Sequence, residues 1–202
     1  RPAVNVSALV GHSTLRVATM DDPYRPATPA EQARMCELLR EGLASGAAGL
    51  SSGVFYATGA AADIDELALL AGITGAAGGV YTTHIRQEMD KVLDSLDEAF
   101  ATARRGQVAL VVSHHKCAGP RNWGRTVETL AHIDAARREQ SIGLDCYPYI
   151  AGSTVLRSEM VDGIIDILIT WSTPHPEMAA RTLASIAHEW GCSQVEACER
   201  LQ

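Results

Sequence analysis

The stretch Val-Ala-Leu-Val-Val-Ser-His-His-Lys, at residues 108–116, contains the two features that decide the fold. Its first five residues form an unbroken aliphatic run, which is typical of a strand buried on both faces of a parallel sheet. Polar residues follow from Ser113 onward. The stretch therefore predicts a buried strand that ends in side chains capable of chemistry.

The same succession of an apolar strand and an amphipathic helix repeats about five times along the chain, close to the ~30-residue length of a βαβ unit. The composition, 47% hydrophobic but only 5% aromatic, suits this alternation. The pattern predicts a parallel α/β sheet with helices outside it, in a single domain. We expect strands at 4–10, 47–53, 79–84, 108–113 and 142–147, an extended segment at 164–171, and helices at 28–46, 63–77, 91–105, 126–140, 176–190 and 193–201.

The charge balance limits the classes of partner. The 202 residues carry 17 Lys and Arg against 24 Asp and Glu, a net charge of −7. A protein that binds nucleic acid through its phosphates usually has a basic surplus, so this balance argues against such a partner. The sequence shows neither a secretory signal nor an apolar stretch suited to a bilayer. Its five cysteines form no Cys-x-x-Cys pair, so we expect reduced thiols and a cytoplasmic location.

Polar residues follow the C-terminal end of each of the five expected strands. In parallel α/β proteins the ligand site lies at this edge, and in barrels it is built from these strand ends and the loops after them. Their convergence favours a (β/α)8 barrel over a doubly wound sheet, and no glycine-rich phosphate loop follows any strand. The residues are His12, Ser51 with Ser52, His84, His114 with Lys116, and Tyr147.

Two of these residues, His84 and His114, follow neighbouring strands. Adjacent strands lie ~4.8 Å apart, so the two imidazoles could converge on one ion at the ~2.0–2.1 Å bond length of zinc. A catalytic zinc normally has three protein ligands and a water, so this pair would be half of a site. The alternative is a pair of hydrogen-bonded structural histidines, and spacing alone leaves both interpretations open.

Two cations, Arg86 and Lys116, lie at the same edge. They are either solvated charges and ion pairs, for example Arg86 with Glu88, or a clamp for a substrate carboxylate. Tyr147 and Ser153 could add hydroxyl donors. Tyr56 lies on a Gly/Ala-rich loop of the kind that forms mobile lids.

Several segments together resemble the N-acyl-D-amino-acid deacylases (D-aminoacylases) of the amidohydrolase superfamily. The resemblance extends over essentially the whole chain, with the segments in the same order and at similar spacing. Residues 167–177 are most similar to the N-acyl-D-glutamate deacylase branch. The other segments are GHSTLR (11–16), GLSSG (49–53), YTTHIR (81–86), SHHK (113–116), NWGR (122–125) and YPYIAGST (147–154).

The resemblance implies a zinc-dependent hydrolase on a (β/α)8 barrel. Its implied reaction is hydrolysis of the amide bond of a small N-acyl-D-amino acid by zinc-activated water, without a nucleic-acid or membrane partner. His84 and His114 match the two histidines that hold zinc on the fifth and sixth barrel strands. Other residues match positions that bind the substrate, namely Lys116, Tyr147 and Ser153 at its carboxylate and Tyr56 on a loop facing it.

The sequence departs from the family pattern in its ligands and base. It contains no His-x-His, no counterpart of the cysteine ligand of the family and no Ser-Asp-Gly with the general-base aspartate after Tyr147. A complete barrel takes ~250 residues. We therefore expect residues 1–202 to be the central part of the barrel, strands three to seven, with its N- and C-terminal parts absent. The chain alone should contain no catalytic residue and no activity.

Two alternatives stay open at this point. One is another amidohydrolase, of the hydantoinase or dihydroorotase type, which would bind two metals. The other is a non-catalytic α/β fragment.

Overall fold

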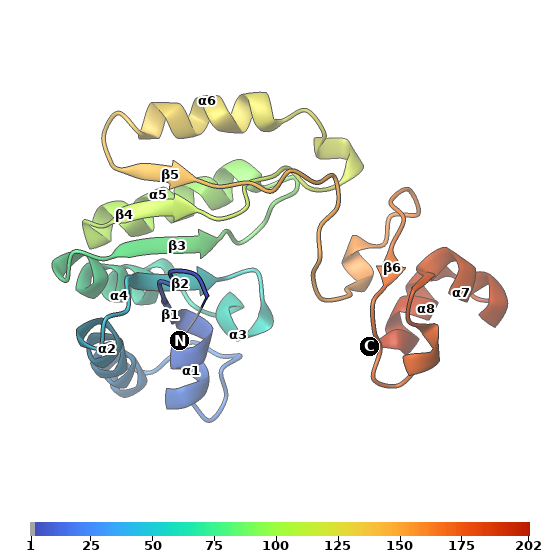
Figure 1. Ribbon diagram of the computed structural model, residues 1–202, viewed down its shortest axis with the longest axis horizontal. Helices are drawn as coiled ribbons and strands as arrows, with labels where there is room; N and C mark the ends of the chain where they lie inside the picture. Colours follow the sequence, from blue (N-terminus) through green and yellow to red (C-terminus); the bar gives the residue numbers. More distant parts are fainter. Residues whose placement is uncertain (1–2) are drawn as a thin grey trace. The chain divides into compact units, whose positions relative to one another are not determined.

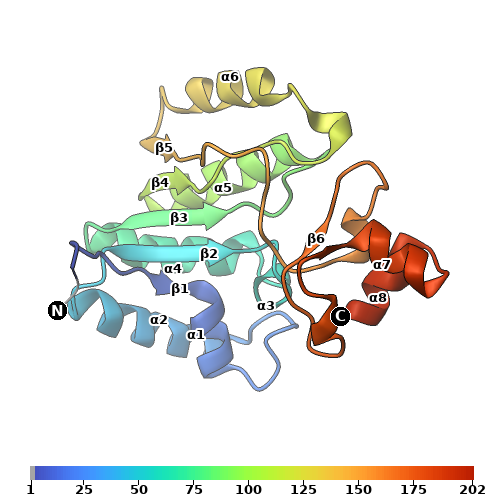
Figure 2. The same cartoon turned by 45° about the vertical axis from the view of Figure 1, so that its right-hand side comes forward.

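The structure, a computed structural model, describes residues 3–202. The chain forms two compact units. The first comprises residues up to Ala118 together with Gly124–Tyr147, and the second comprises Gly119–Trp123 and Pro148–Gln202. Figures 1 and 2 show the strands of the first unit and the smaller helical group that ends the chain.

The first unit is built on a five-stranded sheet whose strands are all parallel and follow one another in sequence order. Helices α2, α4, α5 and α6 pack on one another in the same succession, as the helices around a barrel do (Figure 1). The strands are β1 (Val10–Gly11), β2 (Gly49–Gly53), β3 (Val80–His84), β4 (Ala109–Val112) and β5 (Ile142–Leu144). The helices are α1 (His12–Thr19), α2 (Pro29–Ala44), α3 (Ala57–Ala60), α4 (Ile64–Ala76), α5 (Val92–Gly106) and α6 (Thr126–Ala136).

The strand register explains both the core and the position of the polar edge. Leu50 pairs with Tyr81, Tyr81 with Leu110, and Leu110 with Ile142, so one apolar row crosses four strands. Each of these side chains is at most 4% exposed. Because the strands are parallel and in this register, His84 and the residues after Val112 emerge at the same edge of the sheet.

Local sequence signals place several helix boundaries. Thr28 and Glu31 form a reciprocal capping box at the start of α2, with Pro29 at the first helical position. Ser193 and Glu196 form the same arrangement at the second unit's last helix.

The second unit has its own small core. Strands β6 (Leu168–Ile169) and β7 (Arg181–Thr182) pair antiparallel, and helices α7 (Leu183–Trp190) and α8 (Gln194–Leu201) pack on each other. Leu183, Ile186 and Cys198 are fully buried between them. Residues 3–202 also contain three short 3-10 turns, at Pro120–Asn122, Ser158–Met160 and Pro176–Met178.

Three expectations about the elements are wrong. The strand expected at 4–10 is reduced to Val10–Gly11, because only these residues pair with β2, and Val4 and Val6 are exposed. His12, expected at the polar end of the first strand, instead opens helix α1. The helix expected at 176–190 is interrupted by β7, and only its second half is α-helical; its end at Gly191, with φ 61°, is confirmed.

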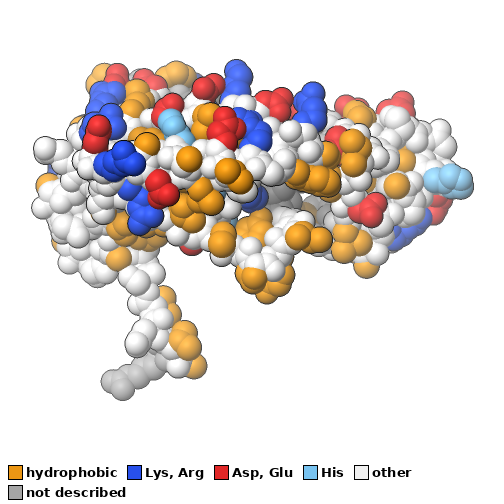
Figure 3. Space-filling model, turned by 90° about the horizontal axis from the view of Figure 1, so that it is seen from above, with side chains coloured by type: hydrophobic (Ala, Val, Ile, Leu, Met, Phe, Trp, Pro, Cys, Tyr) orange, Lys and Arg blue, Asp and Glu red, His pale blue; other side chains and the backbone are white. Residues whose placement is uncertain are grey.

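The surface mixes charges of both signs. On the face seen in Figure 3, Lys and Arg are interspersed with Asp and Glu rather than gathered in a stripe. Among the described residues, no helix combines the length and the apolar character that crossing a membrane requires.

Candidate metal centre at the carboxyl edge of the sheet

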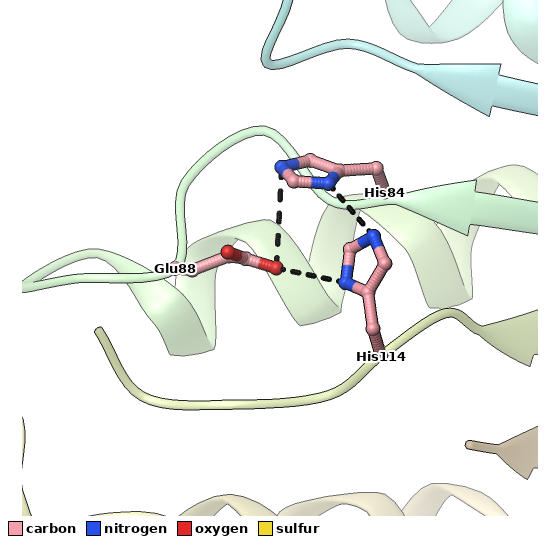
Figure 4. A group of neighbouring side chains, drawn as sticks. All are labelled: His84, Glu88 and His114. Atoms are coloured by element: carbon pink, nitrogen blue, oxygen red, sulfur yellow. Dashed lines mark hydrogen bonds and ion pairs between the residues drawn. The ribbon is translucent and has the colours of Figure 1, made fainter. Parts of the chain in front are cut away.

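Strands β3 and β4 bring the two predicted histidines together. His84 is the last residue of β3, and His114 lies two residues beyond the end of β4. His84 Nδ1 is 3.0 Å from His114 Nε2, and Glu88, on the loop after β3, faces both rings (Figure 4). The potential ligand atoms of these three residues lie within 4.8 Å of one another. The predicted convergence of His84 and His114 is therefore observed.

The backbone at His114 is held in an unusual conformation by the next strand. Its φ is 40°, in the left-handed region that non-glycine residues rarely adopt. Asp145, which follows β5, accepts a hydrogen bond from the His114 backbone N–H through its side chain at 2.6 Å. The Asp145 carbonyl also accepts from the N–H of His115 at 2.7 Å. Asp145 was not predictable from the sequence as part of the site, because an acidic residue after a strand has no distinguishing pattern.

The local environment keeps His84 neutral. Burial, together with the neighbouring His114 and the positive charge of Lys116, lowers the pKa of His84 to about 4. A neutral imidazole offers a lone pair at neutral pH, and this is the form in which histidine binds a metal.

Lys116 connects His114 to Glu88. Its Nζ donates to Glu88 Oε1 at 2.6 Å, lies 2.8 Å from His114 Nδ1, and donates to the His114 carbonyl at 2.9 Å. The same nitrogen is 5.6 Å from the centre of the Tyr147 ring. Lys116 and Tyr147 thus lie together at this edge, beside His114.

Glu88 is a residue of this cluster that sequence reasoning considered only as an ion-pair partner of Arg86. That pairing is wrong, because Glu88 turns toward Lys116. The sequence signal that could have identified Glu88 is its position four residues after His84, on the loop that follows a strand.

Arg86 instead joins helix α5 to the end of helix α3. It forms a bidentate ion pair with Glu98 of α5, at 2.7 and 2.9 Å. It also donates to the carbonyls of Ala60 and Ala62, in and just after α3, at 2.8 and 2.9 Å. A guanidinium engaged in this way acts as a structural clamp.

The loop that Arg86 holds carries two aromatic rings to the metal centre. Phe55 and Tyr56 each lie 5.1 Å from the His84 ring, measured between centroids. Tyr56 was predicted on a loop near the substrate, and the structure places its ring against His84.

His12, another expected edge residue, is placed elsewhere. His12 is fully buried, and its Nε2 lies 2.7 Å from Glu66 Oε1. The side chain of Glu66 also accepts two hydrogen bonds from Arg16, at 2.6 and 2.7 Å, instead of capping its own helix. His12 is therefore part of a buried ion cluster and not of the edge. Ser153 lies in the second unit, in an irregular segment, and is exposed; its role stays a prediction.

The histidine pair fits two ligands of one zinc ion. Two nitrogens bound to a tetrahedral zinc at ~2.0–2.1 Å are ~3.3 Å apart, close to the 3.0 Å between His84 Nδ1 and His114 Nε2. His115 does not contribute, since its Nε2 lies 2.8 Å from the Thr129 hydroxyl, away from the pair, as expected from strand alternation.

Comparison with known proteins gives a consistent set of relatives, although no family model matches the chain. The chain is 48% identical, over its whole length, to the N-acyl-D-glutamate deacylase of Alcaligenes xylosoxydans xylosoxydans. It is 45% identical, over 98% of its length, to the N-acyl-D-aspartate deacylase of the same organism. The chain spans 41% and 40% of the length of these two relatives.

Solved structures agree with the sequence relatives. The N-acyl-D-glutamate deacylase of Bordetella bronchiseptica, crystallised with zinc and a phosphonate mimic of the tetrahedral intermediate, matches all of the chain with a TM-score of 0.95 and 48% identity. A D-aminoacylase described as having a binuclear metal centre matches with the same TM-score and 44% identity. The chain covers 43% and 42% of these structures. The predicted α/β architecture is confirmed, and it matches part of the amidohydrolase barrel of these proteins.

Proposed function

We propose that this chain, a relative of the N-acyl-D-amino-acid deacylases of the amidohydrolase family over its whole length, supplies the metal-binding part of such an enzyme. The reaction is hydrolysis of the amide bond of an N-acyl-D-amino acid, which releases a carboxylate and a D-amino acid. The observation that carries this proposal is the His84–His114 pair at the ends of neighbouring strands.

His84 and His114 would hold a zinc ion through Nδ1 and Nε2, respectively. Zinc bound there would polarise the substrate carbonyl and lower the pKa of a water ligand towards ~7. The buried, neutral state of His84 and the anchoring of His114 by Asp145 keep both donors in place. The segments of this chain that resemble the deacylases contain no general base. A residue outside these segments would therefore move the proton to the leaving amine.

Lys116 and Tyr147 would bind the α-carboxylate of the substrate. Their side chains lie together beside His114, and a lysine ammonium is a strong partner for a carboxylate. Ser153 is assigned to the same carboxylate, and Tyr56 to the substrate side of His84, from the family resemblance. We further assign residues 1–202 to strands three to seven of the barrel.

The proposed setting is the cytoplasm, with a small molecule as the only partner. The sequence has no Cys-x-x-Cys pair and an odd number of cysteines, a pattern that favours a reducing compartment. The net charge of −7 and the intermixed surface charges argue against nucleic acid and against an anionic membrane surface.

Metal binding by the full chain tests the ligand assignment. The chain should take up one zinc ion, weakly, because two of its usual protein ligands lie within it. His84→Ala should abolish this uptake, measured by competition with a chromogenic chelator. His132→Ala is the matched control, since His132 pairs with Asp97 and should leave zinc uptake unchanged. Full zinc uptake by His84→Ala would contradict the assignment.

Activity is tested in a chimera, because the chain spans about two fifths of its relatives. The chain replaces the matching segment of the Alcaligenes N-acyl-D-glutamate deacylase, to which it is 48% identical. The chimera should release D-glutamate from N-acetyl-D-glutamate, and His114→Ala should reduce the rate at least ~10³-fold, as loss of an essential catalytic group does. The 202-residue chain alone should show no turnover. A fully active His114→Ala chimera would refute the proposal.

A further inference from the structure

The ring nitrogens of the histidine pair divide into two sets. His84 Nδ1 and His114 Nε2 face each other at 3.0 Å and are the pair close enough to share one ion. The remaining nitrogens, His84 Nε2 and His114 Nδ1, both point toward Glu88 (Figure 4). Glu88 Oε1 is 3.9 Å from His84 Nε2 and 3.3 Å from His114 Nδ1. Lys116 Nζ lies nearer to His114 Nδ1, at 2.8 Å, and an ammonium can only donate, so His84 Nε2 is the nitrogen that still lacks a partner.

A ligand histidine must place its proton on the nitrogen that the metal does not use. A neutral imidazole carries one N–H, so metal binding through one nitrogen makes the other a donor. His84 Nε2 is buried and has no hydrogen-bond partner among the described residues. A buried donor without an acceptor costs about 1–3 kcal/mol, so this atom requires a partner in the metal-bound protein.

We propose that Glu88 is a positioning residue that accepts the remote N–H group of His84 at Nε2. It thereby fixes the tautomer in which Nδ1 of His84 is free to bind the ion. A carboxylate in this position also makes the His84 imidazole a better ligand, because it stabilises the bound tautomer and orientation. The inference rests on the proposed function, which supplies the metal.

Glu88 is held in place for this role. Its side chain is only 12% exposed, and Lys116 donates to the same oxygen, Oε1, at 2.6 Å. Its backbone carbonyl accepts a hydrogen bond from the N–H of Ala118 at 2.7 Å, which ties the loop after β3 to the loop after β4. The carboxylate is therefore oriented before a metal binds.

Metal affinity is the first measurement. Zinc dissociation constants are determined by chelator competition for the full chain and, in parallel, for the chimera. Glu88→Ala should weaken zinc binding about 10–100-fold, as outer carboxylates of metal sites do. Glu88→Gln keeps one acceptor oxygen in the same shape, so we expect a smaller loss. Glu37→Gln is the matched control, because Glu37 is exposed and pairs with Arg34.

The tautomers are the second measurement, and they separate positioning from simple loss of structure. Long-range ¹H–¹⁵N spectra of zinc-loaded protein should show a proton on Nε2 of His84. This signal should move in Glu88→Gln, whose thermal unfolding should stay within a few degrees of wild type.

The outcomes distinguish this inference from the proposed function. Zinc bound by the wild type and equally well by Glu88→Ala overturns the role of Glu88 alone. Zinc bound through the opposite nitrogens, with Glu88 as a direct ligand, also overturns it. A wild type that takes up no zinc in either protein overturns the proposed function and this inference together.

Discussion

His114 is held in a conformation that its side chain does not favour. A non-glycine residue in the left-handed region costs roughly 1–2 kcal/mol, and the two hydrogen bonds to Asp145 offset this cost. His114, which follows β4, is therefore positioned by Asp145, which follows β5.

Replacing Asp145 with Ala should loosen His114. The loss of one charge-assisted hydrogen bond should lower the free energy of unfolding by about 1 kcal/mol, measured by urea denaturation, and should also weaken zinc binding. Asp145→Asn retains an acceptor oxygen and should recover most of the stability and most of the zinc affinity. Asp134→Ala, on the exposed face of α6, is the control. Equal zinc affinity in Asp145→Ala and wild type would show that the anchor is dispensable.

Arg86→Ala should release the loop that carries Phe55 and Tyr56. The substitution removes the donor to the carbonyls of Ala60 and Ala62 and leaves Glu98 without its ion-pair partner. Hydrogen bonds of charged groups contribute about 1.5–3 kcal/mol, so we expect thermal unfolding to show a destabilisation of about 2 kcal/mol. Arg105→Ala breaks an exposed ion pair with Asp65 and should cost less than about 1 kcal/mol. Similar losses in the two variants would argue against the clamp.

At this scale the sequence predicted the histidine pair but not the residues that support it. His84 and His114 were predictable because parallel strands must end at a common edge, and an apolar run marks each strand. Glu88 and Asp145 lie on loops, where no periodicity says which way a side chain points. Arg86 was assigned to a neighbour in sequence, whereas its partner Glu98 is on the following helix.

Helices α1 and α4 are joined by a buried charge cluster. Glu66 of α4 receives hydrogen bonds from His12 and Arg16 of α1, and all three side chains are at most 2% exposed. Removing one member of a buried ion cluster leaves charges without a partner and typically costs about 3–5 kcal/mol. This cluster is the main polar link between the two helices.

The stability of this link should depend on pH. Burial alone raises the pKa of Glu66, but the hydrogen bonds and charges of His12 and Arg16 outweigh it and lower the pKa below the usual value. The stabilisation is therefore present above about pH 4.3, the pKa of an unfolded glutamate, and is lost as the pH falls through the lower folded value.

The measurement is urea unfolding between pH 3 and pH 7. At pH 7 the variant Glu66→Gln should be about 3–5 kcal/mol less stable than wild type, and this difference should shrink toward pH 3. Glu37→Gln, which removes an exposed partner of Arg34, should follow the wild type at every pH. A difference that stays constant across this range would rule out the ionised state of Glu66 as its source.

Element boundaries were predictable where the signal is local. The capping residues Thr28 and Ser193, and Gly191 in the left-handed region, are short-range features that a sequence displays directly. The strand expected at 4–10 and the helix expected at 176–190 were wrong because strand pairing decides both segments. A segment becomes a strand only where a partner strand pairs with it, and the sequence of the segment does not show its partner.

The two largest hydrophobic cores among residues 3–202 share no residue. Ile186→Ala should destabilise the second unit by about 2–5 kcal/mol through the cavity it leaves. Hydrogen exchange should then accelerate within residues 148–202. Zinc affinity should stay within twofold of wild type, because the histidine pair, Glu88 and Lys116 all belong to the first unit. Loss of zinc binding in this variant would show that the second unit supports the centre.

The anchoring of His114 by Asp145 also sets an order of events during synthesis. The two histidines are 30 residues apart and are both available once His114 has emerged, whereas Asp145 follows 31 residues later. At translation rates of about 5–20 residues per second, the delay is roughly 2 to 6 seconds. A nascent chain therefore presents both imidazoles before Asp145 can hold the backbone of His114.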